Sequence, residues 1–362
     1  MKIKLFKIIV IYIYIEMNDL NEYNKLLNQL KNYTYSKHKL DELEPLLQEE
    51  QRICLLPIKH PDIWALQEKQ LSSFWTSGEI DFSKDLNDWN TKVDDNTKEF
   101  IKNILAFFAG SDTLVNLNIM NNFTRDVSIL EIQHFYQFQA MMENIHSLVY
   151  SLQIDVLIKD DDEKNNLFNA IENIPCITKK MKWCIDWLSN GDRFAKRLIA
   201  FAIVEGIFFS GSFCAIYWIK EKNILPGLTM SNEFISRDEA MHCEFACTLY
   251  KKLLYKLDEN DVHNIIKDAV EIEKEFITES LPCKLIGMNS DLMKEYIECV
   301  ADRLSNMLGY NKIYNSKNPF LFMEKISVDQ KTNFFEHRVS EYAKVNNNNN
   351  NNTFAVNMNL DF

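Results

Sequence analysis

The chain has 362 residues, of which 46% are hydrophobic and 25% are charged, and its net charge is −12. This composition supplies a large apolar core, and the acidic balance argues against nucleic acid as a partner. With only eight glycines and seven prolines, the chain has too few turn residues for a β-rich fold, so we expect long helices. The eight cysteines form no C-x-x-C pair, which favours reduced thiols and a cytoplasmic protein.

The N-terminal part, residues 1–43, is predicted to be a partly disordered extension. Its apolar run, residues 8–15, is far too short to cross a membrane, and acidic and amide residues follow it in place of a cleavage site. One interpretation is a dispensable extension upstream of a start at Met17, and the alternative is a targeting segment. At the other end, residues 343–362 combine an asparagine run with a short apolar tail, which predicts a flexible tether that binds a partner.

Residues 44–342 have the pattern of an all-α protein. Helical periodicity starts near Asn96, with Glu99 as a capping-box partner, and again at Ser128, with Glu131 as partner. The second of these helices is expected to end near residue 158. Further helices are expected at 193–222, 229–254, 262–280 and 291–308.

The most apolar helix, around residues 198–219, is long enough to pass for a membrane span. A charged Glu205 at its centre, and no second segment like it, favour a buried core helix. We therefore predict no membrane association.

Charged side chains inside these apolar helices carry the chemistry. Two helices contain a Glu-x-x-His motif, Glu143 with His146 and Glu239 with His242. The spacing places each glutamate and histidine on one helix face. A helix with a single acid precedes each motif, and these acids are Asp112 and Glu205.

Together these six side chains offer four negative charges and two imidazoles. Two divalent cations would neutralise the charge, and the mixed oxygen and nitrogen ligands suit iron or manganese better than zinc or calcium. Carboxylate bundles with two metal ions use this arrangement, which predicts a ferritin-like helical bundle with additional helices.

Tyr150 lies four residues after His146, about 6 Å further along the same helix face. Spacing alone leaves two interpretations open. The tyrosine is a packed core side chain with a bonded hydroxyl, or it is a phenol beside the metals that survives one-electron oxidation in an apolar pocket lined by Phe209, Phe213 and Ile235.

Several longer stretches resemble the small, radical-bearing subunit of eukaryotic class I ribonucleotide reductase. They are Glu44–Leu47, Met142–Ser147, Val204–Phe213, Ile235–Glu239, Leu281–Asn289, Val300–Leu304 and Lys331–Glu336. The resemblance implies two iron ions per chain in a di-iron-oxo centre, with manganese as the alternative. Asp112, Glu143 and His146 would then bind one iron, whereas the second would be bound by Glu205, Glu239 and His242.

The same resemblance implies that Tyr150 stores a tyrosyl radical, formed when the reduced metal centre activates dioxygen. It assigns an inner radical-transfer chain to Trp89, Asp238 and His146, and an onward step to Tyr342. The partners it implies are a second copy of the chain, in a homodimer, and a large catalytic subunit that binds the C-terminal tail. Together the subunits would reduce ribonucleoside diphosphates to deoxyribonucleotides.

Two other functions are compatible with the same bundle: a regulatory or structural subunit without a working cofactor, and iron storage or another di-iron oxidase. The intact ligand set argues against the first, and Tyr150 together with the tethered tail argues against the second. Two features depart from the resemblance: Leu117 stands where eukaryotic relatives usually carry glutamate, and the C-terminal tail is unusual. A divergent paralogue of the small subunit is therefore one of the interpretations left open.

Overall fold

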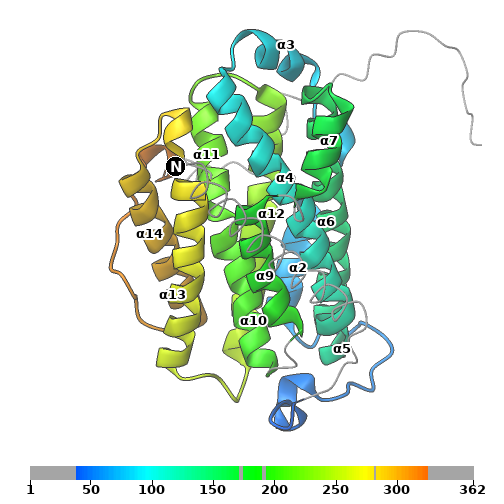
Figure 1. Ribbon diagram of the computed structural model, residues 1–362. Coiled ribbons are helices and arrows are strands. Elements are labelled where there is room, and N and C mark those ends of the chain that lie inside the picture. Colours follow the sequence, from blue (N-terminus) through cyan, green and yellow to red (C-terminus); the bar gives the residue numbers. More distant parts are fainter. Residues whose placement is uncertain (1–37, 171–173, 190–192, 281–282, 325–362) are drawn as a thin grey trace, which may run out of the picture.

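The computed structural model describes residues 38–170, 174–189, 193–280 and 283–324, and the regular elements in these ranges are all helices (Figure 1). This confirms the predicted all-α fold. Most of the predicted N-terminal extension, Tyr342 and the C-terminal tail lie outside the described residues. The main helices are α2 (Pro61–Ser72), α3 (Ser83–Thr91), α4 (Asp95–Asn118), α6 (Leu130–Leu157), α7 (Asp161–Phe168), α9 (Pro175–Ser189), α10 (Phe194–Ile203), α11 (Ser210–Lys220), α12 (Pro226–Lys252), α13 (Glu259–Glu275) and α14 (Ser290–Leu308).

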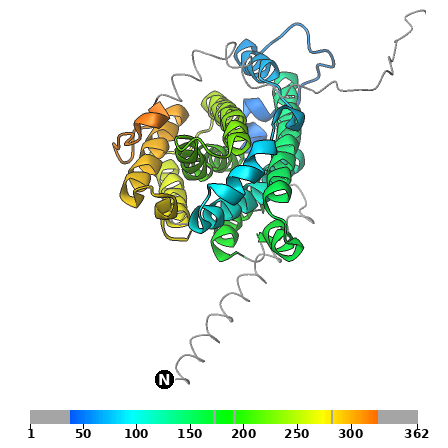
Figure 2. The ribbon, with the colours of Figure 1, turned by 90° about the horizontal axis from the view of Figure 1, so that it is seen from above.

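The long helices run roughly along one axis, and α3 crosses one end of the bundle (Figure 1). Seen from above, α13 and α14 lie on one side, α10 to α12 in the middle, and α4 and α6 on the other side (Figure 2). Helix α4 packs mainly against α6, whereas α10 and α11 pack against α12. The four segments that carry the predicted ligands therefore face one another across the centre of the bundle.

The apolar stretch Phe194–Lys220 is long and hydrophobic enough to cross a membrane, but 94% of its most apolar window is buried inside the protein. It is a core helix, as predicted. The stretch is not one regular helix, because a π-helical turn, η5 (Val204–Phe208), separates α10 from α11. Similar π turns follow α4 (η4, Ile119–Phe123) and α13 (η6, Phe276–Ser280). Such widened turns occur often at functional sites.

Two predicted helix starts need correction. Helix α4 is capped by Asp94, whose carboxylate accepts a hydrogen bond from the Thr97 amide at 3.0 Å, so Asn96 lies inside the helix. Helix α6 begins at Leu130 without a side-chain cap. The expected partner Glu131 instead binds the segment before α2, accepting hydrogen bonds from the Arg52 guanidinium and from the Lys59 amide. Glu131 therefore makes a tertiary contact in place of the local capping contact that the sequence pattern predicts.

Candidate metal centre

All six predicted ligands are buried and come together between four helical segments. Their ligand atoms form two groups that share Glu143. Within each group, the ligand atoms all lie within 4.8 Å of one another. The first group is Asp112, Glu143 and His146; the second is Glu143, Glu205, Glu239 and His242. Asp112 comes from α4, Glu143 and His146 from α6, Glu205 from the π turn η5, and Glu239 and His242 from α12.

Glu143 and Glu239 lie between the two imidazoles. The Nδ1 atom of His146 is 3.0 Å from Glu239 Oε1 and 3.5 Å from Glu143 Oε2. The Nδ1 atom of His242 is 2.8 Å from Glu239 Oε2 and 3.1 Å from Glu143 Oε1. Each glutamate therefore faces both histidines, and these two carboxylates would help to hold cations bound at the centre of the cluster.

The unpaired polar atoms of this cluster test whether metal ions fit it. Four buried ligand atoms have no hydrogen-bond partner: Asp112 Oδ2, Glu143 Oε2, His146 Nδ1 and Glu205 Oε2. Buried polar atoms are almost always hydrogen-bonded in proteins, so four orphans at one place mark a site for something that coordinates them. Oxygen and imidazole donors are ligands for iron and manganese, and the residues present therefore fit a metal pair.

The electrostatics of the cluster lead to the same conclusion. Burial raises the pKa of Asp112 well above its usual value, and the Glu143 carboxylate raises it further. Burial also raises the pKa of Glu205, with added repulsion from Glu239 and Glu143. Carboxylates that repel each other in a dry interior are stabilised by cations placed between them.

Gln139 completes the cluster and is a residue that sequence reasoning missed. Its amide nitrogen Nε2 donates to Glu205 Oε1 at 3.0 Å and approaches Glu143 Oε1 at 3.3 Å. It thereby ties the carboxylate from η5 to the one from α6. The available signal was its position one turn before Glu143, as a polar residue on the same face of an apolar helix.

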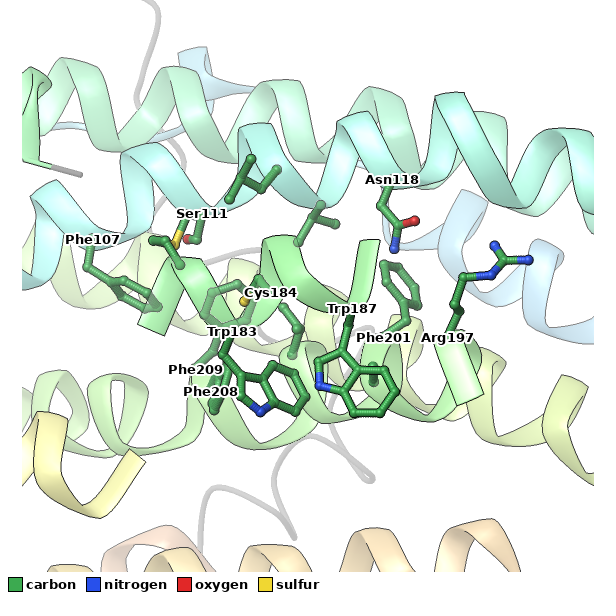
Figure 3. A pocket seen from close by; sticks show the side chains of 15 residues that line it. Phe107, Ser111, Asn118, Trp183, Cys184, Trp187, Arg197, Phe201, Phe208 and Phe209 are labelled. Atoms are coloured by element: carbon green, nitrogen blue, oxygen red, sulfur yellow. The ribbon is translucent and has the colours of Figure 1, made fainter. Parts of the chain in front are cut away.

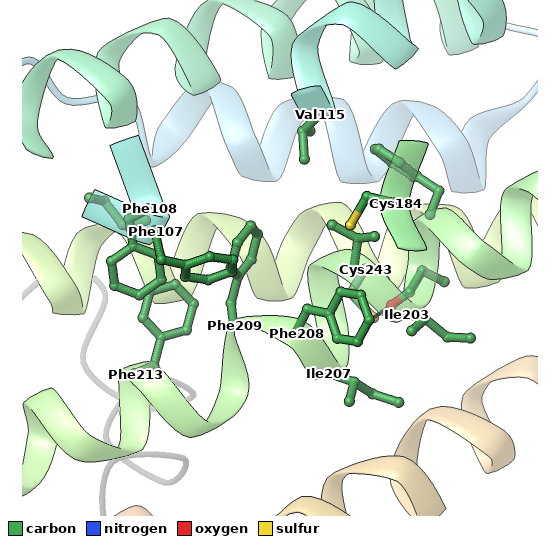
Figure 4. Packing of buried hydrophobic residues seen from close by; sticks show 14 of the residues in the cluster. Phe107, Phe108, Val115, Cys184, Ile203, Ile207, Phe208, Phe209, Phe213 and Cys243 are labelled. Carbon is green, nitrogen blue, oxygen red and sulfur yellow. Dashed lines mark hydrogen bonds between the residues drawn. The ribbon is translucent and has the colours of Figure 1, made fainter. Parts of the chain in front are cut away.

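Tyr150 lies in an aromatic pocket at 2% exposure, and its hydroxyl has no hydrogen-bond partner. Phe108 stacks on it with ring centroids 4.6 Å apart, and Phe213 stacks on Phe108 at 5.2 Å. Figure 4 shows Phe107, Phe108, Phe209 and Phe213 gathered together in this region. The predicted Phe209 and Phe213 do line the surroundings of the phenol, but the ring in direct contact is Phe108.

An apolar cavity of about 20 Å³ lies next to the cluster, between α4, α9 and α10 (Figure 3). Ser111 and Val204 are part of its wall, and each is the direct sequence neighbour of a ligand, Asp112 or Glu205. The rest of the lining is mostly aromatic and aliphatic, including Trp183.

The side chains around the Nε2 atom of His146 agree with the prediction only in part. The Nε2 atom of His146 lies 3.1 Å from Asp238 Oδ2, as expected from the resemblance. The tryptophan that donates to the same oxygen, at 2.7 Å, is Trp75, whose ring also stacks on His146 at 5.9 Å. The expected Trp89 belongs to α3, where its ring faces the ammonium group of Lys98. The choice of Trp89 is therefore wrong.

Trp75 lies just after α2, which packs on both α6 and α12 and so brings the indole over His146. Arg237, also missed from the sequence, donates to Asp238 Oδ1 at 3.1 Å and to the Ser73 carbonyl at 2.8 Å. Both oxygens of Asp238 are thus held by hydrogen bonds, which fixes the orientation of the imidazole.

A helical bundle that gathers four carboxylates and two imidazoles into two groups with a shared glutamate has the architecture of the metal-binding carboxylate bundles. A family model described as ribonucleotide reductase, small chain, matches residues 52–319. The chain belongs to this family and is a small subunit of ribonucleoside-diphosphate reductase.

Curated relatives and solved structures agree with this assignment. The small subunit of ribonucleoside-diphosphate reductase from Dictyostelium discoideum is 56% identical over 303 residues, covering 83% of this chain and 90% of that protein. The small chain from vaccinia virus (strain Copenhagen) is 55% identical over 304 residues, covering 84% and 95%. The Rnr4 homodimer of ribonucleotide reductase from Saccharomyces cerevisiae is similar with a TM-score of 0.73 and 38% identity, covering 87% of this chain and 99% of that one.

A more distant structure has the same fold. The dimanganese(II)-NrdF of Streptococcus sanguinis has a TM-score of 0.67 at 20% identity, covering 76% of this chain and 99% of that one.

Proposed function

We propose that this subunit binds two iron ions with the six clustered side chains and uses them to form and keep a tyrosyl radical at Tyr150. The observation that carries the proposal is the set of four unpaired ligand atoms within one buried carboxylate and imidazole cluster. When bound, a reduced iron pair supplies the means to activate dioxygen and so to oxidise a nearby phenol by one electron. Manganese suits the same ligands and is the alternative metal.

The protein's own part in this function is to position the phenol and protect it. Oxidation of Tyr150 removes one electron and the hydroxyl proton. The hydroxyl has no hydrogen-bond partner, and burial together with the Asp112 carboxylate raises its pKa well above the usual value, so the intact phenol stays protonated. The stacked Phe108 ring shields it from reductants in solution.

Transfer of the oxidising equivalent out of the site is proposed to run through His146, Asp238 and Trp75. Support comes from the hydrogen-bonded contacts of 3.1 Å and 2.7 Å that link the three groups in series. Arg237 donates a hydrogen bond to the other oxygen of Asp238, Oδ1, and so holds the carboxylate in position between His146 and Trp75. Tyr342 and the apolar tail, residues 353–362, remain the proposed continuation to a large catalytic subunit that holds the nucleotide.

The proposed assembly is a homodimer that acts with this large subunit in the cytoplasm, on ribonucleoside diphosphates. The S. cerevisiae relative is a homodimer, and free thiols suit the reducing cytoplasm. The cysteines that the structure describes as free are Cys54, Cys184, Cys214, Cys243, Cys247 and Cys299.

Reconstitution tests the proposal. The full chain, loaded with ferrous iron and exposed to air, is expected to bind two iron ions per chain and to show a tyrosyl radical by electron paramagnetic resonance. Tyr150→Phe should keep the metal and lose the signal, because the cluster is untouched. A radical that persists unchanged in Tyr150→Phe refutes the assignment of that residue. Binding of less than one iron per chain in the wild type supports a scaffold subunit instead.

A further inference from the structure

The helix that carries the metal ligand Glu205 is interrupted just after it. Glu205 lies in the π turn η5, which ends at Phe208, and α11 begins at Ser210. In a regular α-helix the Phe208 carbonyl would accept from the amide of Ser212, and the Gly211 amide would donate to the Ile207 carbonyl. Main-chain groups at such an interruption need other partners when they are buried.

Two charged side chains from other helices bind these main-chain groups. The ammonium group of Lys180, on α9, donates to the Phe208 carbonyl. The Glu273 carboxylate, on α13, accepts from the Gly211 amide at 3.2 Å through its Oε1 atom. The two side chains also pair with each other at 2.5 Å, and both are 0% exposed. The ion pair therefore occupies the break in the helix.

Each of the two charges is opposite in sign to the partial charge of the helix end that it faces. Lys180 binds a carbonyl at the C-terminal end of η5, where the helix dipole is negative, and Glu273 binds an amide in the first turn of α11, where it is positive. Exchanging the two charges would place each against a like partial charge.

The surroundings leave the pair no room to move. The ammonium group lies over the Phe107 ring at 4.1 Å and over the Phe276 ring at 4.0 Å, within the distance of a cation–π contact. A Cβ atom at Gly211 would come within 2.7 Å of Glu273 Oε1, so only glycine lets the carboxylate approach this closely. Because a well-packed apolar pair of the same size is often as stable as a buried ion pair, stability by itself does not account for these two charges.

We propose that Lys180 and Glu273 are positioning residues that hold the helix break after η5 and so place the Glu205 carboxylate for metal binding. Phe208, whose carbonyl Lys180 binds, is only three positions after Glu205, so a regular helix through this point would rotate Glu205 relative to Gln139 and Glu239. The positioning role rests on the proposed metal centre, whereas the contacts at the break do not.

The test compares three full-length variants with the wild type. Lys180→Met removes the donor to the Phe208 carbonyl. The double variant Lys180→Met with Glu273→Gln also removes this donor. It leaves no unpaired charge, however, and keeps an acceptor for the Gly211 amide. Asp126→Asn is the matched control, because it breaks another buried ion pair, whose Arg197 contact is 2.8 Å, away from the break.

Hydrogen exchange of metal-free protein is the first measurement. Amides of residues 205–212, normalised to those of α2, should exchange at least about tenfold faster in both Lys180 variants and not in Asp126→Asn. The second is the electronic spectrum of the iron-loaded protein, which should shift in both Lys180 variants and stay unchanged in the control.

Unchanged exchange and spectrum in Lys180→Met overturn the proposal. Recovery of both in the double variant also overturns it, because the pair then matters only for charge balance. If Lys180→Met does not fold, the double variant decides alone. A wild-type protein that binds no iron refutes the metal centre, while the exchange result still decides whether the pair holds the break.

Discussion

Replacing Trp75 with phenylalanine tests the hydrogen-bonded series at its outer end. The variant loses an indole N–H bond of 2.7 Å to the Asp238 carboxylate, and it leaves a gap where a 2% exposed ring was packed. A hydrogen bond to a charged group contributes roughly 1.5–3 kcal/mol, and the partial loss of ring packing adds about 1 kcal/mol. We therefore expect a destabilisation of about 2.5–4 kcal/mol, measured by urea unfolding of metal-free protein.

The functional effect of Trp75→Phe should be separate from this loss of stability. Turnover with the large subunit should fall to background, while the radical at Tyr150, which is not part of the hydrogen-bonded series, should still form and be visible by electron paramagnetic resonance. Trp89→Phe is the matched control, because it replaces an equally buried tryptophan whose ring faces Lys98. Full turnover in Trp75→Phe, or its loss in Trp89→Phe, would show that the series has been identified wrongly.

Three further outcomes follow from the structure. Phe108→Ala removes the ring stacked on Tyr150, so it should cost about 3–5 kcal/mol in urea unfolding and shorten the radical lifetime; an unchanged lifetime would mean that the ring does not protect the phenol. Burial acts to raise the pKa of Glu131, but hydrogen bonds from Arg52 and the Lys59 amide outweigh it and lower the pKa from 4.5 to about 2. The resulting stabilisation, about 2–3 kcal/mol, is present above pH 4.5 and is lost as the pH falls towards 2; Glu131→Gln should flatten the stability profile across this range, and a parallel profile would contradict the argument. Ferrous iron at about 100 times its dissociation constant should stabilise the wild type against urea by about 2.7 kcal/mol for each site that it fills, and equal stabilisation of His242→Ala would exclude that side chain as a ligand.

The site was partly readable from the sequence because its ligands follow helical spacing. Glu143 with His146, and Glu239 with His242, must share a helix face once the helix exists, whatever packs against it. Acids within apolar helices also imply a partner, since an unpaired buried charge is costly. Helical periodicity in the same way indicated the long helices, although ends such as that at Leu130 depended on contacts with distant residues.

Which tryptophan contacts Asp238, in contrast, depends on the tertiary structure. Trp75 follows α2 and Trp89 lies within the short helix α3, and the local sequence does not show which of them contacts Asp238. The packing of α2 against α6 and α12 decides which indole reaches the carboxylate. Lys180 and Glu273 are 93 positions apart in the numbering, and no periodicity links them. Spacing along one helix is determined by backbone geometry and is therefore written in the sequence, whereas contacts between helices depend on how whole faces pack, and only the folded chain decides them.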